Sequence, residues 1–171
     1  VCSKFIKDFE GADYIVAPSA SCVGFVRNYY AKLFENSSQH NQVKDLSKRI
    51  YEFTEFLTDV LKIESFGAVL NTTATYHDSC AALRECKIKE APRKLLSNVK
   101  GLQLTEMNDV ETCCGFGGTF CVVEEAVSVK MGKDRIADHE KNKVEVITGG
   151  DMSCLMHLEG ILKRKKKFKF Y

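Results

Sequence analysis

The sequence lacks several features that would assign the chain to a common class of protein. No apolar run approaches the roughly 18 to 20 residues of a membrane-spanning helix, and no charged and then apolar start indicates a signal peptide. Only two of the 171 residues are proline, and the formal net charge of +2 is too small to indicate a nucleic-acid partner. Since 44% of the residues are hydrophobic, we expect a cytoplasmic globular protein with a substantial core and no transmembrane segment.

Paired cysteines of the Cys-x-x-Cys type are also absent, although the chain contains eight cysteines. Zinc fingers and zinc ribbons usually present their ligands in such pairs. With no export signal, clustered cysteines indicate metal binding or redox chemistry rather than disulfides. Four thiolates suit either structural zinc or an iron–sulfur cluster. The long spacings favour the cluster, and zinc stays open as the alternative.

The most distinctive stretch begins with two adjacent cysteines, Cys113 and Cys114, which lead into Gly115-Phe-Gly-Gly118. Neighbouring side chains leave the backbone in different directions, so both thiols reach one site only if the backbone bends sharply. Glycine permits such a bend because it adopts positive φ without steric cost. The stretch therefore predicts a loop that wraps two thiolates around a bound group. It lacks the Gly-x-Gly-x-x-Gly spacing and the later acidic residue of a nicotinamide site.

Hydrophobic periodicity predicts alternating strands and helices. Strands are expected at residues 14–17, 72–76, 101–105 and 143–148, and helices at 4–10, 19–33, 43–63, 92–99, 122–141 and 151–162. The helix at 43–63 has the clearest pattern. This alternation predicts an α/β protein, in which a small, mostly parallel sheet flanked by helices forms a three-layer domain.

An internal repeat relates two parts of the chain. Tyr14–Cys22 and Val144–Cys154 share the order of strand, small-residue turn, Ser-Cys and amphipathic helix. We therefore expect residues 1–65 to hold the C-terminal part of a first unit and a linker helix, and residues 66–171 to hold a complete second unit. The first unit would then lack its beginning.

Four cysteines occupy comparable places after predicted strands. In an open α/β sheet, the loops beyond the carboxyl ends of parallel strands meet in one crevice. We therefore expect convergence of Cys80, Cys113, Cys114 and Cys154. The helix that begins near Cys154 favours its thiolate form, because a helix N-terminus lowers the pKa of a thiol.

These cysteines carry a resemblance to a known family. Cys80, Cys113-Cys-Gly115 and Cys154 resemble the cysteine-rich CCG domain found in heterodisulfide reductases and in the iron–sulfur subunits of glycolate oxidase. A longer string, from Tyr76-His-Asp-Ser-Cys80 to Asp151-Met-Ser-Cys-Leu-Met-His157, resembles the lactate utilization protein A family. The resemblance covers nearly all of this chain and corresponds to about the C-terminal two-thirds of such proteins.

The resemblance implies an iron–sulfur cluster of the 4Fe-4S type and a place in a complex that oxidises L-lactate, or a related 2-hydroxy acid such as glycolate, to the keto acid. The implied partners are the other subunits of that complex and, at the level of the complex, the small 2-hydroxy acid. No flavin fingerprint is present, so we expect an electron-transfer subunit rather than a self-sufficient enzyme. The implied ligands are Cys80, Cys113, Cys114 and Cys154 in the second unit, and Cys22 in the first.

The chain departs from the fuller motif, which ends in Cys-x-x-Cys, because Asp151 and Ser19 stand at the earlier position in the two units. A cluster with fewer thiolates, ligation by Asp151 and an open iron are therefore alternatives. His77 is a candidate ligand, a donor to a cluster sulfur, or a side chain that satisfies the backbone near the strand end. Two other functions stay open: a thiol–disulfide reductase subunit, in which Cys113 and Cys114 take part in chemistry, and a zinc-stabilised interaction module. A chain with an incomplete first unit is also compatible with no bound metal.

Other reactive side chains have simpler interpretations. We expect Cys2, Cys86 and Cys121, which lie outside the motif, to pack as small residues. His40 and His139 stand in polar contexts, and we expect them to be exposed. The basic cluster, Lys163–Lys167 with Lys169, is expected to be a solvated helix end.

Overall fold

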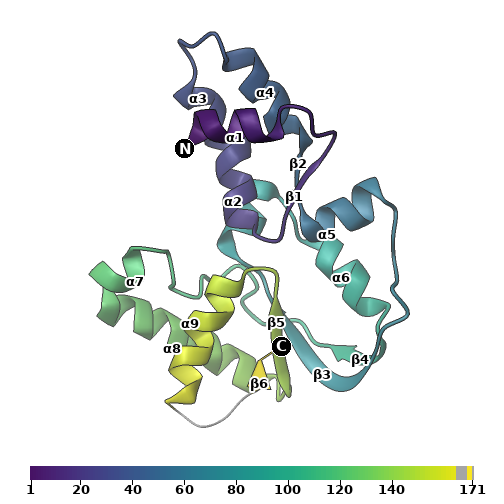
Figure 1. Cartoon of the computed structure of the whole chain (residues 1–171). Coiled ribbons are helices and arrows are strands. Elements are labelled where there is room, and N and C mark those ends of the chain that lie inside the picture. Colours follow the sequence, from purple (N-terminus) through teal and green to yellow (C-terminus); the bar gives the residue numbers. More distant parts are fainter. Residues whose placement is uncertain (165–168, 171) are drawn as a thin grey trace.

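The computed structural model describes residues 1–164 and 169–170. Within them the strands form a two-stranded sheet in the order β1-β2 and a four-stranded sheet in the order β4-β3-β5-β6 (Figure 1). Every strand pair in both sheets is parallel. The predicted α/β class, with small parallel sheets flanked by helices, is confirmed.

The N-terminal part of the chain surrounds the two-stranded sheet. Its elements are α1 (Cys2–Phe9), β1 (Ile15–Ala17), α2 (Ala20–Phe25), the π-helical turn η1 (Val26–Tyr30), α3 (Ala31–Leu33), α4 (His40–Arg49), β2 (Ile50–Glu52), α5 (Phe53–Glu55) and the π-helical turn η2 (Phe56–Val60). The segments α2, η1 and α3 follow one another without a break, as the predicted helix at 19–33 requires.

The C-terminal part is built on the four-stranded sheet. Its elements are β3 (Val69–His77), the π-helical turn η3 (Ala82–Cys86), α6 (Glu90–Ser97), β4 (Lys100–Leu104), α7 (Phe120–Val123), α8 (Glu125–Lys141), β5 (Val146–Gly149), α9 (Met152–Lys163) and β6 (Lys169–Phe170). Helices α8 and α9 lie on one side of the sheet and α6 on the other (Figure 1). This arrangement is the expected three-layer domain.

The prediction of one helix over residues 43–63 is wrong. Helix α4 ends at Arg49, and β2 follows it and pairs with β1, with Ile50 opposite Ile15. Glu52 then begins a new helix, because its carboxylate accepts hydrogen bonds from the backbone N–H groups of Thr54 and Glu55. The apolar residues of this short strand continue the helical spacing, so periodicity alone could not reveal the break.

The predicted repeat has the same local structure in both copies. Strand β1 leads through a short turn into α2, and β5 leads in the same way into α9. Ser19 and Asp151, which precede the two helices, both have an extended backbone. The φ and ψ angles are −134° and 112° in Ser19. In Asp151 they are −121° and 108°. Only the carboxylate of Asp151 caps its helix.

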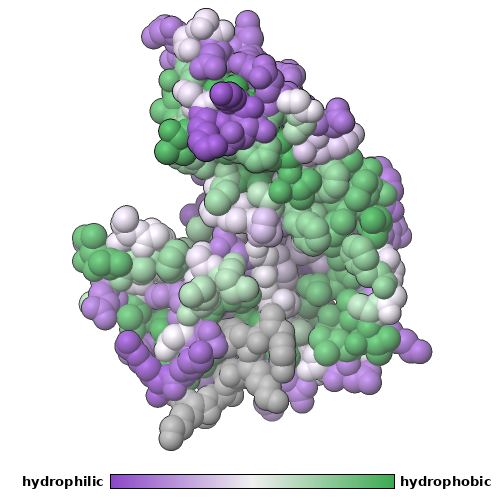
Figure 2. Space-filling view, viewed as in Figure 1, coloured by the Kyte–Doolittle hydropathy of each residue, from purple (hydrophilic) through white to green (hydrophobic). Residues whose placement is uncertain are grey.

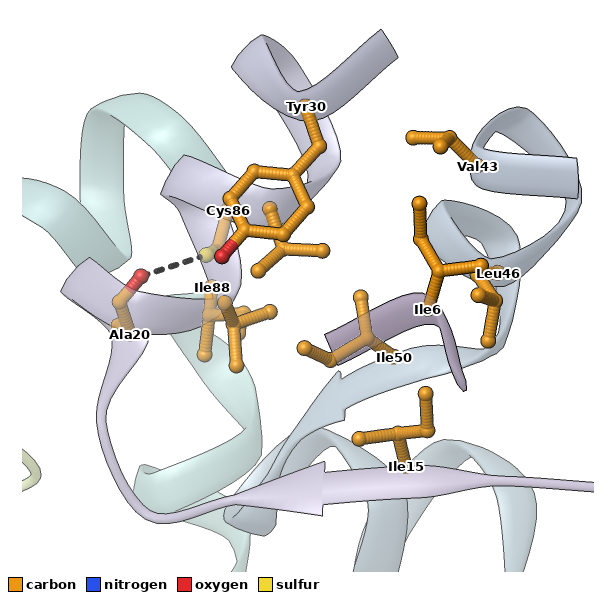
Figure 3. Close-up of a cluster of buried hydrophobic side chains, with 11 residues drawn as sticks. Ile6, Ile15, Ala20, Tyr30, Val43, Leu46, Ile50, Cys86 and Ile88 are labelled. Atoms are coloured by element: carbon orange, nitrogen blue, oxygen red, sulfur yellow. Dashed lines mark hydrogen bonds between the residues drawn. The ribbon is translucent and has the colours of Figure 1, made fainter. Parts of the chain in front are cut away.

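A hydrophobic core joins the N-terminal helices to both strands of the two-stranded sheet (Figure 3). Ile6, Val43 and Leu46 are each 1% exposed at its centre. Two residues from the η3 region, Cys86 and Ile88, complete this core, and the Cys86 thiol donates a hydrogen bond to the Ala20 carbonyl at 3.2 Å. Cys86 is thus a packing residue, as predicted.

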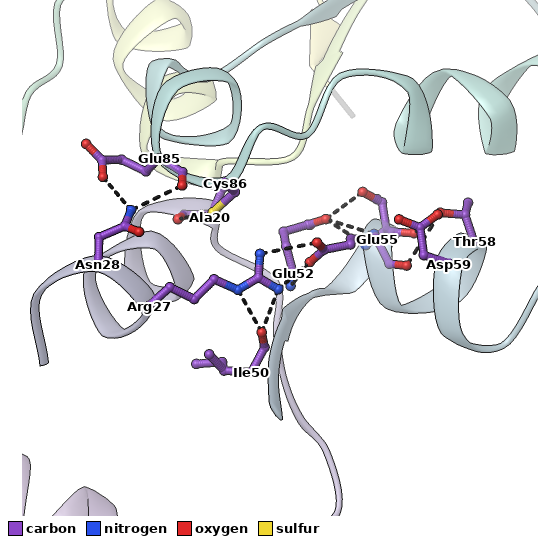
Figure 4. A network of polar contacts seen from close by, with 11 residues as sticks. Ala20, Arg27, Asn28, Ile50, Glu52, Glu55, Thr58, Asp59, Glu85 and Cys86 are labelled. Atoms are coloured by element: carbon purple, nitrogen blue, oxygen red, sulfur yellow. Dashed lines mark hydrogen bonds and ion pairs between the residues drawn. The ribbon is translucent and has the colours of Figure 1, made fainter. Parts of the chain in front are cut away.

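A polar network connects the same parts of the molecule (Figure 4). The guanidinium of Arg27 donates to the carbonyl of Ile50 through Nε at 2.9 Å and Nη2 at 2.6 Å, and it also pairs with Glu55. The amide of Asn28 donates to the backbone carbonyl and the carboxylate of Glu85. These contacts join η1 to β2, to α5 and to η3.

A second hydrophobic core lies between the four-stranded sheet and helices α8 and α9. Its members include Ile136, Ile147, Leu155, Leu158 and Leu162, together with the thiol-bearing residues Cys114 and Cys154. Two of the four cysteines that the sequence predicts to converge are therefore buried against the apolar core of this domain.

None of the helices in residues 1–164 combines the length and the apolar character needed to cross a bilayer. At the C-terminus, Lys163 ends α9 and forms an ion pair with Glu159 at 2.8 Å. The remainder of the predicted basic cluster falls mostly outside the described residues.

Candidate metal centre

The carboxyl end of strand β3 forms one wall of the candidate site. β3 lies between β4 and β5, and its last residues pair with β5, with His77 opposite Gly149. His77 is only 1% exposed. The next residue, Asp78, pairs with Arg93 through both carboxylate oxygens at 2.9 and 2.6 Å. The Ser79 hydroxyl then accepts from the N–H of Ala82 and starts the helical turn that carries Cys80.

The cysteine–glycine loop forms the second wall and bends as predicted. Gly115 has φ of 91°, and a Cβ atom there would lie 2.6 Å from the carbonyl oxygen of Ser128. Because a side chain at this position meets both the backbone strain and this contact, the loop requires glycine. The N–H groups of Gly115 and Phe116 donate to the Sγ atoms of Cys113 at 3.4 Å and Cys114 at 3.5 Å.

The first turn of α9 forms the third wall. Asp151 caps this helix, and one of its carboxylate oxygens accepts from both the N–H and the hydroxyl of Ser153, at 3.2 and 2.6 Å. Cys154 follows in the first turn and is 6% exposed. The Asp151 carboxylate is thus engaged in capping, and it is not among the three ligand atoms that meet at the site.

The three walls bring sulfur and nitrogen atoms together. A ring nitrogen of His77 and the Sγ atoms of Cys114 and Cys154 all lie within 4.8 Å of one another, and all three side chains are buried. Half-buried Cys80 and Cys113 extend the group, because Cys80 is hydrogen bonded to Cys113 and Cys113 to Cys114. Cys80, Cys113, Cys114 and Cys154 therefore meet, as expected, and their role as ligands stays a prediction.

Hydrogen bonds among the thiols shift their pKa values in opposite directions. Hydrogen bonds from Cys114 and then Cys80 lower the pKa of Cys113 to about 2, and the N–H of Gly115 contributes in the same direction. The pKa values of Cys80 and Cys114 are raised, first because each donates to Cys113 and also because each is desolvated. One thiolate among several thiols is a soft donor set, suited to zinc or to an iron–sulfur cluster.

Helix α8 supplies buried polar residues that the sequence analysis did not select. Arg135 is 1% exposed, and its Nε donates to Nδ1 of His77 at 3.2 Å. Its Nη2 donates to the carbonyl of Val110 at 3.3 Å, and its Nη1 donates to the carbonyl of Asp109. Arg135 thereby connects β3 to the segment that leads into Cys113.

The prediction that His139 is exposed is wrong. Its side chain is fully buried, and its ring centroid lies 6.2 Å from that of His77. Burial lowers the pKa of His139 to about 3, and His77 and Arg135 contribute in the same direction. His40 is also half-buried rather than exposed, with Nδ1 at 3.2 Å from the Ala31 carbonyl.

A signal for these residues exists in the sequence. Ser128, Gly132, Arg135 and His139 recur at helical spacing and form the face of α8 that contacts the site. The Ser128 hydroxyl donates to the carbonyl of Gly115 at 2.7 Å. A Cβ atom on Gly132 would lie 2.3 Å from Cδ1 of Ile161, so α8 and α9 approach closely there.

Cys22 lies apart from this group. It is exposed on α2, and it does not belong to the cluster of His77, Cys114 and Cys154. It lines a cavity of about 650 Å³ together with aromatic and aliphatic residues of the N-terminal part of the chain, among them Phe5, Phe25 and Ile50.

Another cavity, of about 380 Å³, lies between α5, α6 and the end of β5. Its walls include Phe53, Leu57 and Leu96, with Glu52 and Tyr76 as polar members, and it contains none of the cysteines. Apolar residues also gather on the surface over α5 and α6 (Figure 2). None of the converging thiols therefore lines this apolar cavity.

Comparison with known proteins gives a consistent match. The CCG cysteine-rich domain family matches residues 74–159, which include all four converging cysteines. Lactate utilization protein A of Geobacillus sp. (strain WCH70) is 43% identical over 163 residues, covering 95% of this chain and 68% of that protein. Lactate utilization protein A of Bacillus subtilis (strain 168) is 40% identical over 164 residues, covering 96% of this chain and 69% of that protein.

Proposed function

This chain belongs to the lactate utilization protein A family and contains a CCG cysteine-rich domain, and from this we propose that it is an iron–sulfur electron-transfer subunit of a lactate-oxidising system. The substrate is L-lactate or a related 2-hydroxy acid such as glycolate, and the product is the keto acid. The observation that carries the proposal is the meeting of four thiols at the carboxyl end of a parallel sheet.

The donor set fits the implied cofactor. Cys80, Cys113, Cys114 and Cys154 would hold a cluster of the 4Fe-4S type, which supplies one-electron transfer when bound. The N–H groups that donate to Cys113 and Cys114 stabilise negative charge on sulfur. Buried Arg135, which donates to His77, adds a cation that interacts electrostatically with Cys114, and Cys114 and Cys154 belong to the apolar core.

Substrate oxidation is assigned to a partner subunit. The sequence has no flavin fingerprint, and the cysteine site, with its buried thiols, is suited to hold a metal rather than a 2-hydroxy acid. The lactate substrate comes from the names of the relatives. The chain would therefore receive electrons within a complex and pass them on.

The same proposal divides the chain into two units. Residues 1–65 would be the C-terminal part of a first CCG unit with a linker, and residues 66–171 the second unit. Support comes from the repeated strand, turn and helix around Ser19 and Asp151, two residues with similar extended backbone angles. On this view Cys22 is a ligand of the first unit, in a position equivalent to that of Cys154.

Lactate-dependent reduction tests the proposed function. The chain would be co-expressed with the products of its neighbouring genes, purified without oxygen and mixed with L-lactate or with glycolate. We expect the visible absorbance of the chain to bleach with one 2-hydroxy acid, and only when the partner subunits are present. A chain that holds a redox-active cluster but bleaches with neither acid would contradict the assignment to 2-hydroxy acid oxidation.

A further inference from the structure

The contact between Arg135 and His77 determines which nitrogen of the histidine carries a proton. A guanidinium offers five N–H donors and no acceptor. Nε of Arg135 points at Nδ1 of His77 with a separation of 3.2 Å, inside the protein. Nδ1 must therefore accept, because a proton on Nδ1 would place two donors against each other. The neutral imidazole then carries its proton on Nε2.

Arg135 has little freedom to abandon this contact. Its side chain is completely buried, and its other nitrogens donate to the carbonyls of Asp109 and Val110. Its Nη1 also lies 3.7 Å from a carboxylate oxygen of Asp138. The carboxylate of Asp138 is itself held by the side chain of Asn108 at 2.7 Å and by the N–H of Asp109 at 3.1 Å.

The Nε2 atom of His77 is buried and has no hydrogen-bond partner within the described part of the chain. A buried N–H without an acceptor is unfavourable, so such a group needs a partner that the protein itself does not supply. The sulfurs of Cys114 and Cys154 are candidate acceptors, since a ring nitrogen of His77 lies within 4.8 Å of both. Buried His139, whose ring centroid lies 6.2 Å away and whose nitrogens also lack a partner in the described part of the chain, is the other nearby group.

We propose that His77 is not a metal ligand but a positioning residue, which Arg135 fixes as an Nε2–H donor to a sulfur atom of the bound cluster. A histidine that binds a metal through Nε2 needs its proton on Nδ1, and Arg135 opposes that form. The ligands of the second unit are then its four cysteines. This inference rests on the proposed function only for the identity of the group that accepts the hydrogen bond.

Together, His77 and Arg135 would raise the reduction potential of a bound cluster. A hydrogen bond to sulfur and a nearby buried cation both stabilise the more negative, reduced state, and so raise the reduction potential. Arg135 also joins His77 to the segment before Cys113, so one side chain orients the donor and the loop together.

The tautomer is measured first, in the metal-free chain, by ¹⁵N nuclear magnetic resonance of the histidine rings. His77→Gln identifies the signals of His77 by their loss. We expect an unprotonated Nδ1 and a protonated Nε2. A proton on Nδ1 would overturn the inference. This measurement needs no cofactor, so a chain that takes up no iron would count against the proposed function and leave the tautomer test intact.

The second measurement compares variants in the reconstituted chain. The amide of glutamine can replace an Nε2–H donor, so His77→Gln should keep the iron content and a midpoint potential close to wild type. His77→Ala should also keep its iron, with a lower potential. His40→Gln is the matched control and should change neither property, because half-buried His40 begins α4, where its Nδ1 lies 3.2 Å from the Ala31 carbonyl. Loss of iron in His77→Gln as large as in Cys154→Ser would show that His77 is a ligand.

Discussion

The hydroxyl of Ser128 lies 2.7 Å from the carbonyl oxygen of Gly115 and donates a hydrogen bond to it. This bond joins the first turn of α8 to the loop that carries Cys113 and Cys114. The approach is so close that a Cβ atom on Gly115 would lie 2.6 Å from the carbonyl oxygen of Ser128 and 2.8 Å from Cβ of Met131. The shape of the thiol site therefore depends on glycine at position 115.

Gly115→Ala should destabilise the chain by about 2 to 4 kcal/mol, because it adds a steric overlap to an unfavourable positive φ. Gly118→Ala is the control, since Gly118 also has positive φ (62°) but a Cβ atom there meets nothing within 4 Å. Its cost should be about 1 kcal/mol. Urea unfolding of the two variants measures both changes in unfolding free energy. Equal losses of unfolding free energy would show that the packing of α8 on the loop is not tight.

Asp78→Asn should cost about 1 to 3 kcal/mol of unfolding free energy, because it removes the more buried of the two carboxylates that pair with Arg93 and leaves the half-exposed Glu106 as its counter-charge. The side chains of Asp78 and Arg93 are 1% and 12% exposed. Asp134→Asn is the control: it removes an ion pair with Lys130 whose two side chains are 57% and 70% exposed. Surface pairs contribute little, so denaturant titration should find the control unchanged. A similar small loss in both variants would contradict the assigned role of Asp78.

Stability should fall as the pH is lowered from about 6.5, because the folded chain keeps His139 neutral while the unfolded chain binds a proton there. The folded pKa of His139 is about 3 and its ordinary value is 6.5, so the loss continues through this interval as the pH falls. One such histidine contributes about 1.4 kcal/mol per pH unit.

His139→Leu removes this contribution. Unfolding free energies measured between about pH 6.5 and pH 5 should therefore fall less steeply in the variant than in the wild type. Parallel curves for the two proteins would mean that His139 takes up its proton equally in the folded and unfolded chains, against its complete burial.

The convergence of the cysteines was predictable because it follows from topology. Cys80 and Cys154 come shortly after strands that pair side by side, β3 and β5, so their positions follow from the order of strands and helices. The repeat around Ser19 and Asp151 was predictable for a related reason, since a strand, a capping position and a helix are all local features.

The missed features depend on contacts between distant segments. The sequence Ile50-Tyr-Glu52 becomes a strand because it pairs with β1, which lies far away in the chain, and its residues also fit the helical spacing around it. Arg135 and His139 have the polar character of a solvated helix face. Their spacing with Ser128 and Gly132 places them on one face of α8, but the spacing alone does not show that this face is buried. Their burial results from the packing of α8 over the end of β3.

The proposed function depends most on the claim that the four converging cysteines hold an iron–sulfur cluster. Iron, zinc and acid-labile sulfide should be measured in the anaerobically reconstituted chain, with electron paramagnetic resonance of the reduced protein. The matched variants are Cys114→Ser, within the buried group, and Cys121→Ser, beside the loop, where the thiol of Cys121 donates to the Gly118 carbonyl at 3.0 Å. We predict comparable iron and sulfide in the wild type and in Cys121→Ser, and their loss or an altered signal in Cys114→Ser. Zinc without sulfide, or the same iron and signal in all three proteins, would contradict the claim.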